Sequence, residues 1–485
     1  MTKMNEATSA LMTPLAEALE ILQEFPPVPT EAWEAAIHVD LKGADYNKKL
    51  VWNSDEGIVV RPYYRSEDIK DLESQTGLIP AAFPFVRGRG CQSWRQVESQ
   101  GQVAADAIRV DAIHEQGGTI VQELGYGIAL GVESLVERSH AASDVDEAAK
   151  GIRFVFAIGS NYFFEIAKLR AARMLWARAV SAFEPRDESS CLMKVHACTA
   201  LCNKSIYDPF ANVLRATTEA MAAVIGGCDS LEVRAFRFSD RLALNIQRLV
   251  QEESHFDRVA DPAGGSYYVE WLTNALANQG WGLFQQVDAE GGYTKAKGSI
   301  DRAVAESRAA RDKAVSSRRR TLVGVNNYPD LNETINGPVE VPQGSWRAAS
   351  PFERLRLKTE AFTRERGKRP KVLLLERGDL TLRQARSQFS QNFFGCAGFE
   401  IEISHEYERS DADLIALCSS DPEYLALAQE VCPKVKQPVV VAGDPKAQLE
   451  QIKAAGVQGF IHIRTNAIAA LTEWEKRLGI GGANK

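Results

Sequence analysis

Between residues 107 and 254, short apolar runs alternate with longer segments in which apolar residues recur every three or four positions. The short runs are typical of buried strands, and the longer period is typical of helices that cover them. The pattern therefore predicts strand–helix units in one parallel sheet, with the strand ends gathered on one face. The expected strands are 107–113, 152–159, 192–199 and 231–236, and the expected helices are 121–138, 161–183, 208–227 and 239–254.

The helix expected at 208–227 has the clearest boundaries. Asp208 is expected to cap its N-terminus, Pro209 to start its first turn, and Gly226 to lie near its C-terminus. A further helical stretch is expected at 273–318.

A second alternation of apolar runs and helical segments starts at Lys371. Five short strands alternating with helices predict a doubly wound, flavodoxin-like domain. The expected strands are 371–376, 399–403, 413–418, 438–443 and 459–463. The domains expected along the chain are a helix with an extended aromatic arm at 1–80, a (β/α) domain at 81–335, a linker at 336–369 and the flavodoxin-like domain at 370–485.

Composition narrows the class of protein further. Of the 485 residues, 45% are hydrophobic and 25% charged, as in ordinary soluble domains. A formal net charge of −7 argues against nucleic acid or an anionic membrane as the main partner. No apolar run approaches 18 residues, and the acidic N-terminus is unlike a secretory signal, so a cytoplasmic protein is expected. The eight scattered cysteines favour reduced thiols over a zinc site.

Three longer segments carry the most specific signal. In RVADPAGGSYYVE, residues 258–270, Pro262 and Gly264 predict a tight turn before an ordered element. The other two segments are AIGSNYFFEIAKLRAARMLW at 157–176 and VGVNNYP at 323–329. All three resemble the cobalamin-dependent acyl-CoA mutases, above all the methylmalonyl-CoA mutase family. Blocks of this length in this order are far more specific than a short motif.

The resemblance implies a (β/α)8 barrel that threads a CoA ester, followed by a flavodoxin-like domain that carries cobalamin. The barrel half is short, however. WRQV at 94–97 resembles the family's entry segment, and VDAIHEQGGTIVQEL at 110–124 resembles its fifth strand. Only about a dozen residues separate them, where the family has roughly four βα units. We therefore expect a partial TIM-type barrel, with about four recognisable units, that needs another surface to cover its sheet edges. A deletion in the gene model is the alternative.

The resemblance also indicates which chemistry is missing. Val97 stands where the family has a tyrosine over the acyl group, Ala112 where it has a histidine, and Cys198 where it has a substrate-contacting glutamine. A thiol cannot reproduce the donor and acceptor of an amide. Because losing several preorganised polar groups removes most transition-state stabilisation, no catalytic residue is expected in this chain.

Four residues are candidate substrate contacts. Arg95 matches an arginine along the family's CoA path, with a surface or inter-domain ion pair as an equal alternative. His196 matches a family histidine, and Glu115 matches a glutamate near the adenosyl group. His114 would share a strand face with Ala112 and so become a substitute histidine, although a structural histidine is commoner at such a position.

Cobalamin binding in the family uses a DxHxxG loop after the first strand of the second domain. The matching segment here, RGDLTLRQARSQFSQNFFG at 377–395, contains no histidine. His405 and His462 are expected to be structural, and VAGDP at 441–445 is only a weak remnant of the glycine-rich turns. We therefore expect this chain to bind neither a metal nor the cofactor.

Heterodimeric members of the family pair a catalytic large subunit with a small subunit that lacks these groups, and this chain resembles such a small subunit. The expected partner holds adenosylcobalamin and isomerises methylmalonyl-CoA to succinyl-CoA, while this chain adds interface and stability. Two alternatives stay open. One is an active acyl-CoA mutase with a rearranged site, and the other is a stand-alone degenerate module that binds a CoA thioester or a protein.

Overall fold

The computed structural model describes residues 27–91, 94–98, 106–142, 144–335, 337, 339, 341 and 346–481. The chain divides into two compact units, Met1–Tyr64 and Arg65–Lys485. The helix expected at the very start of the chain lies outside the described residues. Within the described parts of the chain, no helix is long and apolar enough to cross a membrane.

The described part of the first unit, residues 27–64, contains two helices and a small hairpin. These are α2 (Thr30–Asp40), α3 (Tyr46–Leu50), β1 (Trp52–Asn53) and β2 (Val59–Val60), with the two strands antiparallel. Glu34 of α2 accepts hydrogen bonds from the hydroxyls of Tyr63 at 2.5 Å and Tyr46 at 3.3 Å. The ring of Trp33 lies 5.1 Å from that of Tyr63. Because α2 buries none of its residues, these aromatic contacts are what attach it to the rest of the unit.

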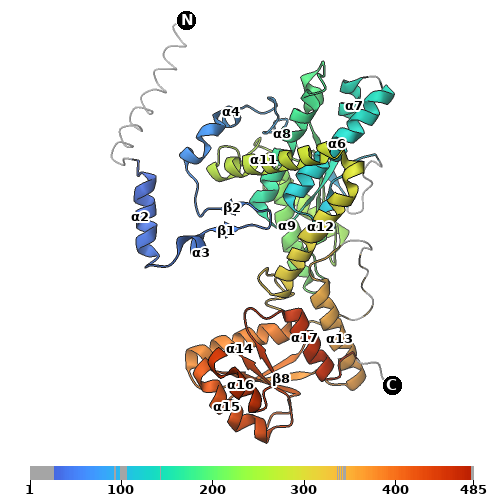
Figure 1. Cartoon of the computed structure of the whole chain (residues 1–485). Helices are drawn as coiled ribbons and strands as arrows, with labels where there is room; N and C mark the ends of the chain where they lie inside the picture. The colour runs from blue at the N-terminus through green and yellow to red at the C-terminus, as the bar shows by residue number, and fades with distance from the viewer. Residues whose placement is uncertain are drawn as a thin grey trace. The chain divides into compact units, whose positions relative to one another are not determined.

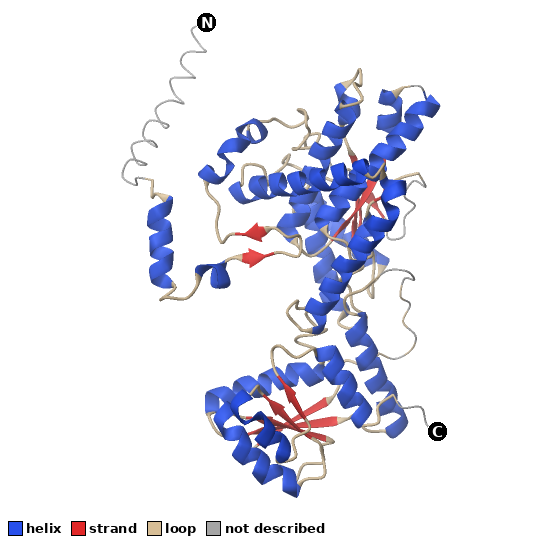
Figure 2. Cartoon of the chain, viewed as in Figure 1, coloured by secondary structure: helices blue, strands red, loops and turns tan. Residues whose placement is uncertain are grey.

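The second unit opens with a five-stranded parallel sheet (Figure 2). Its strands are β3 (Arg95–Val97), β4 (Ile108–Arg109), β5 (Arg153–Ile158), β6 (Lys194–Thr199) and β7 (Ser230–Glu232). The spatial order is β3-β7-β6-β5-β4, so the first strand pairs with the last, as in the closure of a barrel. Among the described residues β3 and β4 each have one neighbour, which leaves the array open. The predicted partial barrel is confirmed.

Helices pack against one face of this sheet, and these are α6 (Ile120–Ala142), α8 (Tyr162–Ser181), α9 (Pro209–Ile225) and α10 (Asp240–Arg248). Three further helices, α7 (Val145–Gly151), α11 (Tyr267–Ala289) and α12 (Tyr293–Ser316), pack on α6. Phe154 of β5 meets Trp176 of α8 edge to face, with ring centroids 4.8 Å apart. A β-carbon at Gly131 of α6 would lie 2.5 Å from the Phe154 ring, so this glycine allows the close approach of α6.

The predicted helix boundaries have clear physical causes. Asp208 caps α9 by accepting a backbone hydrogen bond from the first turn, and Gly226 is its C-cap, both as predicted. The stretch expected at 273–318 is in fact two helices, α11 and α12. Gly291 and Gly292 separate them, with φ angles of 95° and 98° that other residues rarely adopt.

The strand predicted at 107–113 is wrong over most of its length. Only Ile108 and Arg109 are extended, and Asp111–Glu115 forms a short helix, α5. As an edge strand, β4 has hydrogen bonds to β5 alone, so little holds the following residues extended. His114 and Ala112 therefore lie on a helix and do not share a strand face.

The segment 258–270 is the centre of a buried network of charges. The guanidinium of Arg170 on α8 lies 3.2 Å from the carboxylate of Asp261 and 2.8 Å from that of Glu270. Arg87 approaches the same two carboxylates, at 3.3 Å and 3.9 Å. Arg170 and Glu270 are completely buried. The segment thus joins α8, α11 and the chain that leads into β3.

Two further contacts show why the turn contains glycine and how Gln75, which precedes β3 in the chain, joins this network. A β-carbon at Gly264 would overlap the guanidinium of Arg87, so glycine is required where that side chain crosses the turn. The backbone N–H of Gly265 donates to Glu270 at 2.9 Å, and Gln75 donates to the other oxygen of that carboxylate at 2.8 Å. Every polar group of Glu270 is therefore used inside the protein.

The C-terminal half contains a second parallel sheet. Its strands are β8 (Lys371–Glu376), β9 (Glu400–Ser404), β10 (Leu414–Cys418), β11 (Val439–Ala442) and β12 (Gly459–Ile461). Its helices are α14 (Leu380–Gly395), α15 (Tyr424–Val431), α16 (Leu449–Ala454) and α17 (Ala467–Arg477). The spatial order β9-β8-β10-β11-β12 is that of flavodoxin. Since β10 and β11 are buried along their whole length, the predicted flavodoxin-like domain is confirmed.

The residues expected to link the two domains include a helix, α13 (Ser350–Arg366), which Figure 1 shows beside α17. Its buried Glu353 pairs with Arg347 at 2.6 Å and accepts the backbone N–H of Ile206 at 2.9 Å. The hydroxyl of Tyr207 donates to Glu360 at 3.1 Å. This segment is therefore hydrogen-bonded to the loop after β6. The domain boundaries given above stay a prediction.

Replacing Gly264 with alanine is expected to displace Arg87 and to destabilise the protein by about 1–3 kcal/mol, the usual cost of forcing an extra methyl into a packed site. Urea unfolding followed by circular dichroism would measure the change. Gly298→Ala in α12 is the matched control, because nothing lies within 4 Å of its added β-carbon. The control should be neutral or slightly stabilising, and equal effects of the two changes would contradict the packing argument.

Candidate functional site

The face of the barrel sheet opposite the helices carries a group of buried polar residues. His196 and Cys198 of β6 lie on this face, in register with Ser230 and Glu232 of β7. The Nδ1 atom of His196 is 2.9 Å from the Ser230 hydroxyl, and its Nε2 atom is 3.9 Å from the Glu232 carboxylate. Nε2 has no hydrogen-bond partner among the described residues. His196 therefore faces the inside of the partial barrel, where the resemblance predicts a substrate contact.

Arg234, just after β7, is the electrostatic centre of this inner face. Its guanidinium lies 2.8 Å from Asp111 and 3.1 Å from Glu115, and it lies 3.9 Å from Glu232. Arg109 adds two hydrogen bonds to Asp111, at 2.8 Å and 2.7 Å. Burial raises the pKa of Asp111, but the two guanidinium groups outweigh it and hold this pKa below its usual value. Asp111 is thus an ionised partner of both arginines.

Sequence reasoning missed this arginine, although a usable signal was present. In LEVRAF the alternation of side chains along an extended chain places Arg234 on the same face as Glu232. Of the residues predicted to contact substrate, Glu115 contacts Arg234 directly, and His196 lies 3.9 Å from Glu232, which Arg234 also approaches. One oxygen of Glu115 contacts Arg234 and also accepts the backbone N–H of Leu201 at 2.9 Å, while its other oxygen, Oε2, is buried without a hydrogen-bond partner among the described residues.

His114 belongs to a different, completely buried cluster. Its Nδ1 atom lies 3.0 Å from Glu123 of α6. The ammonium of Lys168 lies 2.8 Å from Glu123 and 2.6 Å from Glu165. Burial and the charge of Lys168 lower the pKa of His114 to about 4, so the ring is neutral at pH 7. The structure thus places His114 in a framework cluster between α5, α6 and α8.

Arg95 is the first residue of β3 and stands opposite Ser230 in the sheet register. Its side chain is exposed, unlike that of His196. No hydrogen bond or ion pair of its guanidinium is found within the described parts of the chain. Of the four predicted contact residues, Arg95 therefore has the side chain that is most available to a ligand.

Trp346 covers part of the inner face. Its indole packs against the small buried residues of β5, β6 and the loop that follows β6, which are Val155, Ala157, Cys198, Ala200 and Cys202. Its backbone N–H donates to the Glu115 carbonyl at 3.0 Å, and its indole N–H donates to Asp312 of α12 at 2.9 Å. The indole of Trp346 thus covers the part of the inner face that these small side chains form.

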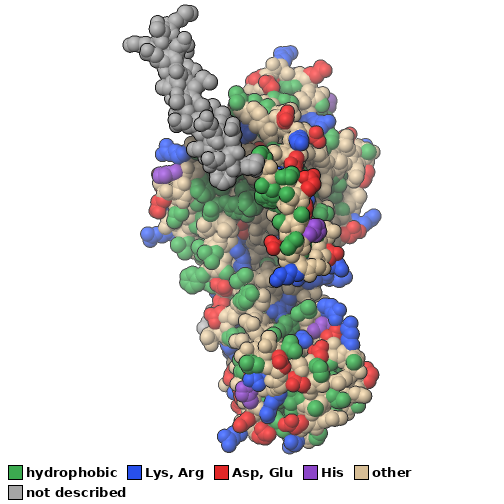
Figure 3. Space-filling model, turned by 90° about the vertical axis from the view of Figure 1, so that its left-hand side faces the viewer, with side chains coloured by type: hydrophobic (Ala, Val, Ile, Leu, Met, Phe, Trp, Pro, Cys, Tyr) green, Lys and Arg blue, Asp and Glu red, His purple; other side chains and the backbone are tan. Residues whose placement is uncertain are grey.

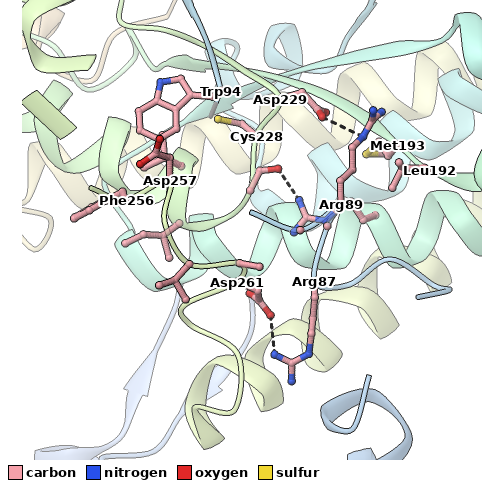
Figure 4. Close-up of a pocket in the computed structure, with 18 residues that line it drawn as sticks. Arg87, Arg89, Trp94, Leu192, Met193, Cys228, Asp229, Phe256, Asp257 and Asp261 are labelled. Atoms are coloured by element: carbon pink, nitrogen blue, oxygen red, sulfur yellow. Dashed lines mark hydrogen bonds and ion pairs between the residues drawn. The ribbon is translucent and has the colours of Figure 1, made fainter. Parts of the chain in front are cut away.

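A small pocket lies at the amino-terminal ends of β3, β6 and β7 (Figure 4). Its volume of 60 Å³ is far below the ~300–1,000 Å³ of small-molecule sites. Arg87 pairs with Asp261 and Arg89 with Asp229, each at 3.3 Å, while Trp94 lies across the pocket. Arg87 and Arg89 therefore both form ion pairs within the protein. A larger groove of 430 Å³ between α8 and α11 is lined mainly by apolar side chains and lies away from the inner face.

The second domain lacks a histidine at the place where the resemblance predicts a cobalt ligand. The loop after β8 offers no histidine, as the sequence indicates. The Nδ1 atom of His405 lies 2.8 Å from the carbonyl of Glu376, and the Nδ1 atom of His462 accepts the backbone N–H of Arg464 at 3.1 Å. The described residues contain no group of three potential metal ligands. These residues do not fit a cobalt ligand, so no chemical step is assigned to the cofactor on this chain.

A partial barrel of parallel strands followed by a flavodoxin-like domain defines the architectural class, and comparison with known proteins identifies the family. The family model for methylmalonyl-CoA mutase matches residues 98–366. A methylmalonyl-CoA mutase small subunit of Porphyromonas gingivalis is 32% identical across 96% of this chain and 99% of its own length. The chain belongs to the methylmalonyl-CoA mutase family.

Other relatives match shorter parts. A small subunit of Streptomyces virginiae is 33% identical over 77% of this chain and 64% of its own length. A large subunit from the same organism is 39% identical over 54% of this chain and 37% of its own length. The match to the Porphyromonas protein extends over 620 positions against 485 residues here, so at least 135 positions have no counterpart in this chain. A gap of that total is what several missing βα units would leave.

Replacing Lys168 with methionine is expected to destabilise the fold by about 3–5 kcal/mol, because it leaves two buried carboxylates without their cation. Denaturant unfolding would measure this loss. Lys297→Met is the matched control, since Lys297 pairs with Asp301 on the surface and its loss should have little effect. A similar result for both variants would show that the buried cluster contributes no special stability.

The neutral state of His114 predicts a pH dependence of stability. Its pKa is about 4 in the folded protein against an ordinary value of 6.5, so the unfolded chain takes up the proton first. The contribution of His114 to the free energy of unfolding should therefore fall as the pH is lowered from 6.5 towards 4, while its partner Glu123, whose pKa burial raises to about 7, acts in the opposite direction. Unfolding curves of the wild type and His114→Asn across this range would test it. If the variant loses stability as steeply as the wild type, another group is responsible.

Proposed function

We propose that this chain is the small, non-catalytic subunit of an adenosylcobalamin-dependent methylmalonyl-CoA mutase. It supports a catalytic large subunit that isomerises methylmalonyl-CoA to succinyl-CoA. The observation that carries the proposal is the match to the Porphyromonas small subunit, which takes in nearly the whole of both chains. The cofactor and the reacting acyl group belong to the large subunit in this proposal.

The inner face supports a non-catalytic role. The positions where the resemblance predicts chemistry contain Val97, Ala112 and Cys198, and burial raises the pKa of the Cys198 thiol well above its usual value. A thiol of that kind is neither a nucleophile nor a proton donor at neutral pH. The one strong charge cluster of this face is self-paired around Arg234.

The four candidate contact residues enter the proposal with unequal support. Arg95, His196 and Glu115 have polar atoms left available, so they are the residues that would touch a CoA ester if one binds. His114 is used by Glu123. No residue of this chain is assigned a catalytic role.

The surface is suited to a protein partner in the cytoplasm. On the face displayed in Figure 3, basic and acidic side chains are interspersed. A nucleic-acid-binding protein would instead need a concentrated basic patch. The alternatives of an active mutase with a rearranged site and of a stand-alone binding module are outcomes of the experiment that follows.

Co-expression with a large subunit encoded in the same genome tests the proposal. The two chains should co-purify, and mutase activity with adenosylcobalamin should require both. In the complex, Arg95→Ala should leave kcat within about twofold, because the reacting groups lie in the partner.

Two results would contradict the proposal. If this chain alone took up adenosylcobalamin and turned over substrate, it would be an active mutase. If no large subunit bound it and its loss left mutase activity unchanged, the stand-alone module would be favoured.

A further inference from the structure

The groove between α8 and α11 belongs to the helical layer outside the barrel sheet, where Figure 1 shows the two helices near each other. Its volume of 430 Å³ is within the ~300–1,000 Å³ of small-molecule sites. Two sets of three residues at helical spacing line its walls, Met174, Arg178 and Ser181 of α8 and Asn274, Asn278 and Trp281 of α11. Residues at this spacing share one face of a helix, so each helix turns one face towards the groove.

Most of the groove surface is apolar. Leu175 and Ala277 are buried residues that line it from below, and Phe83 and Pro84 contribute from the chain that precedes β3. Met174 adds a flexible thioether side chain, which adapts to the shape of a ligand. Because the removal of such surface from water is favourable, the groove is suited to the apolar body of a ligand.

Arg178 is the only charged residue among those that line the groove. Its guanidinium carbon lies over the ring of Trp281, 4.6 Å from the ring centre, which is a cation–π contact. This contact holds the cation at the groove wall. No hydrogen bond or ion pair of the guanidinium is found within the described parts of the chain, so its N–H groups remain available to an acceptor.

Two amides lie on the opposite wall. The side chains of Asn274 and Asn278, one turn apart on α11, form no hydrogen bond with the residues that the structure describes. Each amide offers both donors and an acceptor. The small pocket at the amino-terminal strand ends is different, because its Arg87 and Arg89 are paired with aspartates. The α8–α11 groove thus combines an apolar surface with polar groups that the protein itself leaves unused, as ligand sites do.

We propose that the α8–α11 groove binds an amphipathic carboxylic acid. The carboxylate meets the guanidinium of Arg178, and the apolar body lies against Leu175, Ala277 and Trp281. A guanidinium matches the two oxygens of a carboxylate in geometry and charge. A phosphate dianion would require a second cation, which the groove lining does not supply. The site goes beyond the proposed function, because it lies outside the inner face and requires neither cobalamin nor the reacting acyl group.

Isothermal titration of the full chain with octanoate tests the proposal. Octanoate should bind with a Kd below about 1 mM, which for a ligand of this size is an ordinary affinity per atom. Acetate has the carboxylate without the apolar body, and octanol has the body without the charge, so each should bind at least about tenfold more weakly. Octyl phosphate separates the two anions. If it bound more tightly than octanoate, or if octanoate did not bind in this range, the proposal would be overturned.

Variants at exposed positions locate the two parts of the ligand without disturbing the core. Arg178→Gln should weaken octanoate at least about tenfold and leave octanol unchanged. Arg302→Gln, at an exposed arginine of α12 outside the groove, is the matched control and should change neither. Asn278→Phe fills the groove and should abolish binding of both, with Tm within about 2 °C of the wild type. Equal octanoate affinity of Arg178→Gln and the wild type would place the carboxylate elsewhere and refute the proposal.

A measurement on the wild type is independent of variant folding. A photoreactive diazirine analogue of octanoate should label peptides that contain residues 174–181 and 274–281, and an excess of octanoate should remove this label. Labelling of other peptides alone would overturn the proposal. None of these readouts involves a large subunit. Their failure would leave the heterodimer proposal intact, and failure to form a heterodimer would leave this site intact.

Discussion

The architecture of the barrel half depends on one buried contact, between Arg170 of α8 and the carboxylates of Asp261 and Glu270. These charges are removed from water, so each is tolerable only because the others are present. Through them the turn at 258–270 is attached to α8, α11 and the segment that carries Arg87. The segment 258–270, which carries much of the resemblance to the family, is therefore a structural joint of the barrel half.

The open barrel raises a second physical problem, because a parallel sheet normally has both faces covered. Along its outer face the solution is ordinary helix packing. On the inner face the chain uses its own groups, since Arg234 neutralises Asp111 and Glu115, and Trp346 packs against the small side chains of β5 and β6. In the second domain, the Glu423 carboxylate accepts hydrogen bonds from the loops that follow β8 and β10.

Much of the fold was predictable because it depends on local patterns. Apolar runs and their spacing gave most strands and helices, and the capping of α9 by Asp208 follows from the chemistry of a single turn. The error at 107–113 has a tertiary cause, because a residue in an edge strand stays extended only if a neighbouring strand holds it. The candidate contact residues stay predictions: His196 lies on the inner face, while His114 contacts Glu123 in another cluster.

The sequence by itself determined the family, the two α/β halves and the absence of a cobalt-binding histidine after β8, since these are properties of residue type and order. Tertiary structure alone decided which charges meet. Arg234 and Asp111 are 123 residues apart in the chain, and no local pattern pairs them. It also decided that Trp346 covers the inner face and that Glu423 receives donors from two loops. Such contacts depend on where distant strands end, which the order of residues does not reveal until the sheet has formed.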